Sequence, residues 1–220
     1  MFAAELINYE ITPLHTSDTV QRALERMAEF HVRHMPIVNE EQFLGMVAEA
    51  DLIAETDHQT AIGAVALSLV NPYVREDQHI YDVIRLFYEQ QLTIVPVLDL
   101  KKNYLGSISI IDMNNWFARI TSVSEPGGIL VLEISNRNNS LAHISQIVES
   151  DNAQILSSYV RTFPDSTRME VTLKVNKQDI SGITSTFLRY GYEIKATFNH
   201  TENRDGAMDR YDALMNYLNL

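Results

Sequence analysis

The sequence predicts a mixed α/β (α+β) fold, in which a duplicated β-α-β-β-α unit precedes a ferredoxin-like βαββαβ domain. The first observation behind this prediction is an internal repeat, because residues 10–56 align with residues 70–117 at an offset of 60. The second is the order of apolar patterns after Gly127-Gly128, where strand-like and helix-like segments follow one another as in a plait.

The composition has enough apolar residues for a packed core and an excess of acidic over basic residues. Apolar residues make up 45% of the 220, and 17 Lys+Arg stand against 29 Asp+Glu, a net charge of −12. Binding to phosphate or to anionic lipid needs clustered basic residues, so we expect neither nucleic acid nor membrane partners. The absence of cysteine excludes disulfides, thiolate catalysis and Cys-ligated metals. With no signal sequence and no apolar stretch beyond the ten residues 61–70, we expect a cytoplasmic protein.

Each copy of the repeat predicts the same elements in the same order. An extended start, at Ile11–Leu14 or Tyr73–Val74, leads to residues suited to capping a helix, Ser17-Asp18 or Asp77. The helix that follows has apolar residues at Val20, Ala23, Leu24 and Met27 in one copy and at Ile80, Val83, Ile84 and Phe87 in the other. The expected strands are Met35–Val38, Leu44–Ala48, Ile94–Leu98 and Leu105–Ile110, and second helices begin near Asp51 and Asp112.

Two stretches of the repeat resemble a known family. The run Phe30-His-Val-Arg-His-Met-Pro-Ile-Val, then Phe43-Leu-Gly-Met-Val and Asp51-Leu, resembles a CBS repeat, and Leu92-Thr-Ile-Val-Pro-Val-Leu with Leu105-Gly-Ser-Ile-Ser-Ile-Ile-Asp resembles its partner. The resemblance implies a tandem CBS pair, or Bateman module, over residues 1–122. Its repeats are expected at about 8–58 and 66–120.

The same resemblance implies a ligand site at the turn from the second strand to the second helix. The family signature Gly-x-x-(Thr/Ser)-x-x-Asp is complete in the second copy as Gly106, Ser109 and Asp112. Its carboxylate can accept hydrogen bonds from both ribose hydroxyls of an adenosine ligand. The first copy keeps Asp51 but has Ala48 at the hydroxyl position, which weakens that half-site.

A basic pair that family members often direct at phosphates also differs between the copies. It is present as Arg33-His34 in the first copy and replaced by Thr93-Ile94 in the second. The sequence favours one adenosyl-ligand site built on Ser109 and Asp112. Two alternatives stay open, namely that neither site binds and the aspartates only cap helices, or that both sites bind.

Charge bears on the identity of this ligand. Residues 1–122 contain 8 basic and 17 acidic residues, which gives about −9, whereas residues 123–220 contain 9 and 12. ATP would meet an unfavourable field there unless Mg²⁺ or Arg33 compensates. AMP or the cationic S-adenosylmethionine is easier to accommodate, and we expect no resident cofactor beyond such an effector.

The second half predicts strands and helices in the order βαββαβ. The strands are Ile129–Ile134, Ala153–Thr162, Met169–Val175 and Tyr192–Phe198, and the helices run from Leu141 to Glu149 and from Asp179 to Gly191. Asn136-Arg-Asn-Asn-Ser-Leu-Ala-His-Ile with Asp151-Asn-Ala-Gln-Ile155 resembles an ACT domain, expected over residues 127–200. The resemblance implies an amino-acid site at Asn136, Asn139 and Leu141. Asn139 stands where the family has glycine, so a purely dimerising or degenerate ACT domain is the alternative.

The remaining motifs predict no catalysis. His31-Val-Arg-His34 lacks the carboxylate or cysteine neighbours of a metal site, and no Gly-x-Ser-x-Gly, Walker lysine loop or His-Glu-x-x-His occurs. Residues 203–220 predict an amphipathic C-terminal helix that covers the protein's own core or a dimer seam.

The order of these parts resembles the acetoin-utilisation family of CBS–ACT proteins. That resemblance implies a non-catalytic regulatory protein, in which the CBS pair binds AMP, ATP or S-adenosylmethionine and the ACT-like domain or an unknown regulated protein reads the change. A homodimer is expected from both families. The alternative is a dimeric structural or interaction module whose ligand sites are degenerate.

Overall fold

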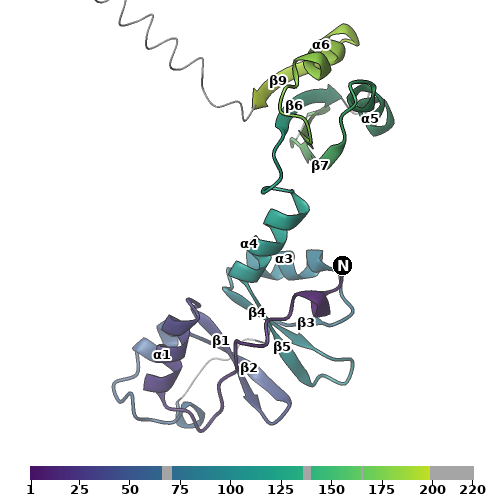
Figure 1. Ribbon diagram of the computed structural model, residues 1–220. Helices are drawn as coiled ribbons and strands as arrows, with labels where there is room; N and C mark the ends of the chain where they lie inside the picture. Colours follow the sequence, from purple (N-terminus) through teal and green to yellow (C-terminus); the bar gives the residue numbers. More distant parts are fainter. Residues whose placement is uncertain (66–70, 136–139, 165, 199–220) are drawn as a thin grey trace, which may run out of the picture. The chain divides into compact units, whose positions relative to one another are not determined.

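The computed structural model describes residues 1–65, 71–135, 140–164 and 166–198. It divides into two compact units, Met1–Phe117 and Ala118–Leu220 (Figure 1). The helix expected over 203–220 and the candidate residues Asn136 and Asn139 lie outside the described residues. Among the helices of the described ranges, none is both long enough and apolar enough to cross a membrane.

The first unit confirms the predicted order of elements in the second repeat, and in the first repeat from its first helix onward. The strand expected at Ile11–Leu14 is instead a single bridge between Leu14 and Ile37. After a short 3-10 helix at Ala3–Leu6, the first repeat contains α1 (Val20–Glu29), β1 (His34–Asn39), β2 (Gln42–Ala48) and α2 (Glu49–Ile53), followed by a 3-10 turn at Ile62–Ala64. The second contains β3 (Val74–Arg75), α3 (Ile80–Gln90), β4 (Ile94–Leu98), β5 (Tyr104–Ser109) and α4 (Ile110–Ile120).

The strand pairs of the two repeats match in register. Strands β1 and β2 form an antiparallel pair with an irregularity between Ile37 and Val38, and β4 and β5 form one with an irregularity between Val97 and Leu98. These positions are 60 residues apart, which is the offset of the repeat. The copies therefore share a backbone plan as well as a sequence pattern.

The apolar spacing of the first helices also produces the expected packing. Val20, Ala23 and Met27 are buried on α1, and Ile80, Val83 and Phe87 are buried on α3. Each set lies on one side of its helix because residues three and four apart share a helical face. Ile94 of the second repeat packs into the core cluster of the first repeat, so the two repeats share buried surface.

The predicted helix caps were wrong by one or two residues. Thr19 caps α1 by accepting the Arg22 N–H, and the His79 ring accepts the Tyr81 N–H at the start of α3. Asp18 instead accepts the His15 N–H at 2.8 Å, and Asp77 pairs with Arg75 at 3.1 Å. Several polar residues precede each helix, and the residue that caps is the one where the backbone turns from extended to helical.

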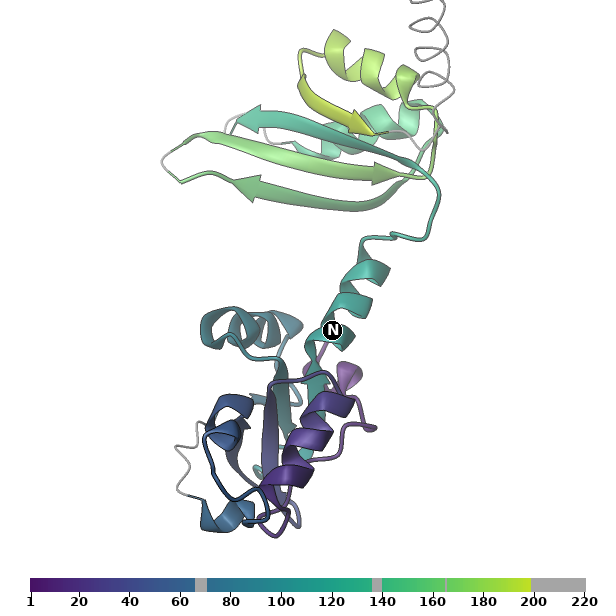
Figure 2. The same cartoon turned by 90° about the vertical axis from the view of Figure 1, so that its left-hand side faces the viewer.

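The second unit is a four-stranded antiparallel sheet with the strand order β7-β8-β6-β9. Two helices cover one face of this sheet (Figure 2). The elements in chain order are β6 (Gly128–Ser135), α5 (Leu141–Ser150), β7 (Ile155–Thr162), β8 (Arg168–Val175), α6 (Ser181–Arg189) and β9 (Glu193–Phe198). Connectivity and strand order together are those of a ferredoxin-like plait, which confirms the predicted fold class.

The open face of this sheet carries charge instead of a core. Lys195 Nζ lies 3.1 Å from Glu133 Oε2 and 2.7 Å from Glu170 Oε1. These hydrogen bonds lower the pKa of Glu133 and raise the pKa of Lys195. The chain that leads into β6 is held at the same sheet, where Ser157 Oγ donates to the Thr121 carbonyl at 3.2 Å and Lys174 Nζ donates to the Val123 carbonyl at 3.2 Å.

Candidate functional site

The turn from β5 into α4 ties two of the predicted site residues together. Ser109 is the last residue of β5, and Asp112 lies in the first turn of α4. The Ser109 N–H and hydroxyl both donate to Asp112 Oδ2, at 2.9 and 2.6 Å, while the Asp112 N–H donates to Ser109 Oγ at 3.1 Å. This reciprocal arrangement is a capping box, which satisfies amides at the start of the helix. Ser109 is buried and Asp112 is half-buried.

A residue that the sequence analysis missed completes this turn. Asn8 Nδ2 donates to Asp112 Oδ1 at 3.1 Å, and the Asn8 backbone N–H donates to the Ser107 carbonyl at 2.9 Å. Asn8 and Asp112 are 104 positions apart in the chain, so no spacing rule connects them. Asn8 lies at the start of the first repeat, outside the signature residues, and no pattern in the sequence marks it.

Gly106, the third member of the signature, has a packing role. Its φ is +155°, and a Cβ built on it would lie 2.3 Å from Cγ2 of Ile7. Carbon atoms in contact normally stay about 3.5–4.0 Å apart, so a side chain at this position would displace Ile7. The glycine lets the segment with Ile7 and Asn8 lie directly against β5.

The basic pair of the first repeat meets the second repeat at Thr93. The Arg33 N–H donates to Thr93 Oγ1 at 2.8 Å, and His34 Nδ1 lies 3.2 Å from the same oxygen. The Thr93 carbonyl accepts the N–H of Ile110 at 3.1 Å, at the start of α4. Thr93, which the sequence analysis treated as the replacement of a basic residue, thus contacts both the basic pair and the start of α4.

Electrostatics around the basic pair involve Asp51. Burial lowers the pKa of His34, the neighbouring Arg33 charge lowers it further, and Asp51 partly opposes both effects. Arg33 and Asp51 are both exposed. The structure therefore places three predicted site residues within electrostatic reach of one another, on the first-repeat side of Thr93.

The matching turn of the first repeat lacks the capping box. Ala48 is the N-cap of α2 and offers no side-chain hydrogen bond, and α2 is five residues long. α4, in contrast, has eleven residues. The missing capping box follows from the sequence, because alanine has no side-chain oxygen that could accept a hydrogen bond from a helix amide, as Ser109 Oγ does from the Asp112 N–H.

Of the three residues predicted for an amino-acid site in the second unit, the structure describes only Leu141. Leu141 begins α5 and is 49% exposed, directly after Ser140, whose hydroxyl accepts the His143 N–H at 3.1 Å. Asn136 and Asn139 lie outside the described residues. The amino-acid site stays a prediction.

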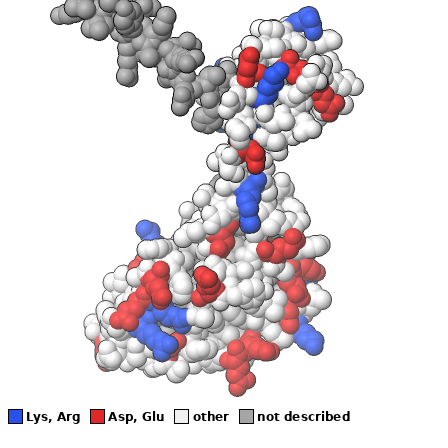
Figure 3. Space-filling model, in the orientation of Figure 1, with Lys and Arg blue, Asp and Glu red and all other residues white. Residues whose placement is uncertain are grey.

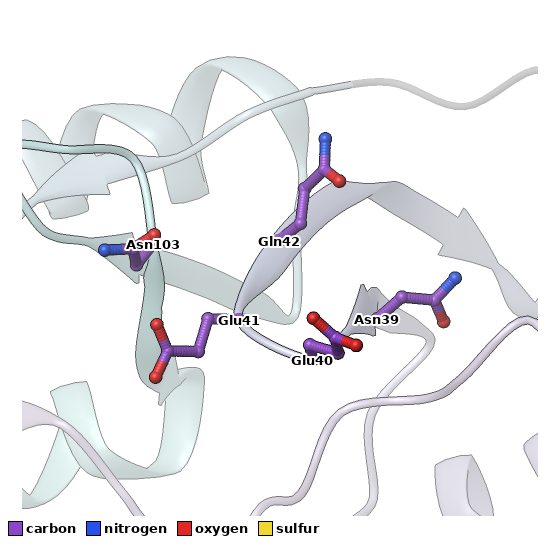
Figure 4. A pocket seen from close by; sticks show the side chains of 5 residues that line it. All are labelled: Asn39, Glu40, Glu41, Gln42 and Asn103. Carbon is purple, nitrogen blue, oxygen red and sulfur yellow. The ribbon is translucent and has the colours of Figure 1, made fainter.

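An open hollow lies where the two hairpin turns of the first unit meet (Figure 4). The Tyr104 N–H donates to the Glu41 carbonyl at 2.7 Å, and Gln42 bridges to Asn103. The hollow is lined by Asn39, Glu40, Glu41, Gln42 and Asn103. Its two carboxylates would repel a phosphate, and across the described ranges no group of three His, Cys, Asp or Glu residues is placed to hold a metal ion.

Comparison with known proteins identifies the repeat. The CBS domain family model matches residues 3–57 and 67–119. A CBS domain pair/ACT domain protein from Thermotoga maritima is 24% identical over 53% of this chain and 96% of its own, with a TM-score of 0.48. The CBS domains of a transcriptional regulator from Streptococcus pneumoniae are 21% identical over 52% and 98%, with a TM-score of 0.47. CBSX2 in complex with AMP is 20% identical over 54% and 97%, with a TM-score of 0.46.

Proposed function

We propose that this chain, whose first unit is a tandem pair of CBS domains, is a non-catalytic regulatory protein that binds an adenosine-containing ligand at the β5–α4 turn. The observation that carries the proposal is the pairing of Ser109 with Asp112 at the start of an eleven-residue helix. The first repeat has neither the hydroxyl nor a helix of that length. We therefore assign one ligand site, in the second repeat.

The chemistry of this turn suits a ribose. A carboxylate accepts hydrogen bonds from hydroxyl groups, and a charged acceptor makes such bonds stronger than a neutral one. The N-terminus of α4 adds the partial positive charge of a helix end, which favours a nearby phosphate. The two hydrogen bonds that Ser109 donates to Asp112 Oδ2 hold the carboxylate in one orientation before any ligand arrives.

Net charge favours AMP or S-adenosylmethionine over ATP. On the face drawn in Figure 3, acidic side chains cover more of the first unit than basic ones do. A polyanion is repelled by such a field unless a cation compensates. Arg33 is exposed and takes part in none of the ion pairs of the described residues, so its guanidinium can meet a single phosphate.

The proposed regulation depends on the contact between the ligand-binding turn of the second repeat and the first repeat. A ligand changes a conformational equilibrium only through its different affinity for the two states. The contacts of Thr93 with Arg33 and with the start of α4 provide a link that a ligand can tighten or loosen. We propose that the ACT-like unit or a partner protein reads this change, in a homodimer of the acetoin-utilisation type.

Calorimetric titration tests the proposal. AMP, ATP and S-adenosylmethionine are titrated into the wild type, Asp112→Ala and the matched control Asp51→Ala. We expect Asp112→Ala to weaken binding about 10- to 100-fold, since a hydrogen bond to a charged group contributes about 1.5–3 kcal/mol. Asp51→Ala should stay within about twofold of the wild type. No heat with any of the three ligands, or equal affinity in Asp112→Ala, would rule out this site.

A second candidate function has support from one observation. Both carboxylate oxygens of Asp112 already accept hydrogen bonds from the protein, as expected of a residue that only caps a helix. The chain would then be a dimeric structural or interaction module with degenerate sites. Its thermal midpoint would not respond to nucleotides, because only a ligand of the native state stabilises it.

A further inference from the structure

A short N-terminal segment, residues 7–10, lies across the candidate site, and we call it the N-terminal strap. Ile7 contacts β5 at Gly106, and the Asn8 N–H donates to the Ser107 carbonyl at 2.9 Å. The Asn8 side chain then bonds in two directions. Its Nδ2 donates to Asp112 Oδ1 at 3.1 Å, and its Oδ1 accepts the Glu10 N–H at 3.0 Å.

The acceptor capacity of Asp112 is almost exhausted by these contacts. An ionised carboxylate offers about four lone-pair sites, two on each oxygen. Ser109 fills both sites on Oδ2 with its N–H and its hydroxyl, and Asn8 fills one site on Oδ1. One site remains, whereas a ribose that binds through both hydroxyls needs two. One of the existing donors must therefore leave when such a ligand binds.

Asn8 is the donor that gives way at the least cost. Its hydrogen bond to the carboxylate is the longest of the three, at 3.1 Å against 2.9 and 2.6 Å. The Ser109 contacts belong to the cap of α4, so breaking them would also expose an amide of that helix. Asn8 can rotate away while the backbone of the strap stays in place.

We propose that Asn8 is a latch that competes with the ligand ribose for Asp112, so that binding through both hydroxyls releases the latch. This inference rests on the proposed function and extends it. It makes Asn8 a specificity-determining residue, because a ligand with one sugar hydroxyl can use the remaining lone pair and leave the latch closed. When Asn8 rotates away from Asp112, the Glu10 N–H also loses its hydrogen bond to Asn8 Oδ1.

Asn8→Ala and Asn8→Leu test the latch, the second keeping the side-chain size without a donor. Each full-length variant is titrated with AMP, ATP and S-adenosylmethionine, and with 2′-deoxy-AMP and 2′-deoxy-ATP as the sugar controls. We expect ribose ligands to bind about three- to tenfold more tightly than to the wild type, the range of one hydrogen bond no longer broken. The 2′-deoxy ligands should be unchanged. Glu10→Gln is the control variant, since Glu10 enters the strap through its backbone N–H.

Hydrogen exchange at the Glu10 amide gives a second readout that does not depend on affinity. In the wild type, a ribose ligand should speed this exchange and a 2′-deoxy ligand should not. Binding that needs Asp112 but is equal in wild type and Asn8→Ala, with Glu10 exchange unchanged, overturns the latch and leaves the proposed function standing. No binding of any ligand to wild type or variant overturns both. Binding seen only in the variants supports the latch.

Discussion

The two CBS repeats share a strand plan and differ at the turn that follows it. Their hairpins carry the same irregularity 60 residues apart, at Ile37/Val38 and at Val97/Leu98. After the second strand, one repeat has Ala48 and a five-residue helix, and the other has Ser109 and an eleven-residue helix. The paired strands build the core and are alike in the two repeats, whereas the turn that follows them, the proposed ligand site in the second repeat, differs.

The largest effect on stability is expected where the second repeat meets the strap. Gly106→Ala would place a Cβ 2.3 Å from the Ile7 side chain, at a φ of +155° that other residues rarely adopt. Overpacking and backbone strain cost about 1–3 kcal/mol each, so together we expect a loss of about 2–6 kcal/mol. Urea denaturation followed by circular dichroism measures it.

A second variant separates the two causes of that loss. Ile7→Ala in the Gly106→Ala background removes the atom that clashes and should recover part of the stability, leaving the strain of the backbone. If Gly106→Ala is as stable as the wild type, the close packing of the strap against β5 is wrong.

Substitution of the turn residues tests whether the serine or alanine at the N-cap causes the difference between the two repeats. Ser109→Ala should cost about 1 kcal/mol by removing the cap of α4. Ala48→Ser should add about 0.5–1 kcal/mol, because a serine there can form with Asp51 the capping box that Ser109 forms with Asp112. Unfolding free energies of both variants check these signs, and equal values in both would contradict the comparison.

The smallest expected effect is a pH dependence from the first repeat. Burial and Arg33 hold the pKa of His34 below its ordinary value of about 6.5 in the folded state. Between the folded and the unfolded pKa of His34, the unfolded chain binds more protons than the folded protein. The contribution of neutral His34 to the free energy of unfolding is therefore fully present above about pH 6.5 and is lost as the pH falls through the folded pKa. His34→Gln should lose less stability than the wild type between pH 7.5 and 5.5 in urea titrations. An equal loss in both proteins would exclude this role of His34.

Local pattern was sufficient for most of the fold. Helical spacing located α1 and α3, and the strict alternation of Met169, Val171, Leu173 and Val175 located β8. Such patterns are readable because burial repeats with the period of the element itself. The predicted helix caps, Ser17-Asp18 and Asp77, were wrong, because the structure has Thr19 and His79 as the caps. A cap depends on where the backbone turns and not on residue type alone.

The sequence by itself determined the duplication, the order of elements in both units and the Gly106, Ser109 and Asp112 signature of the second repeat. Only the tertiary structure decided which distant residues meet that signature. Asn8 reaches Asp112 across 104 positions, and Thr93 reaches Arg33 across 60. Contacts of this kind leave no periodic trace in a chain, because they depend on how whole elements pack and not on the spacing of neighbours.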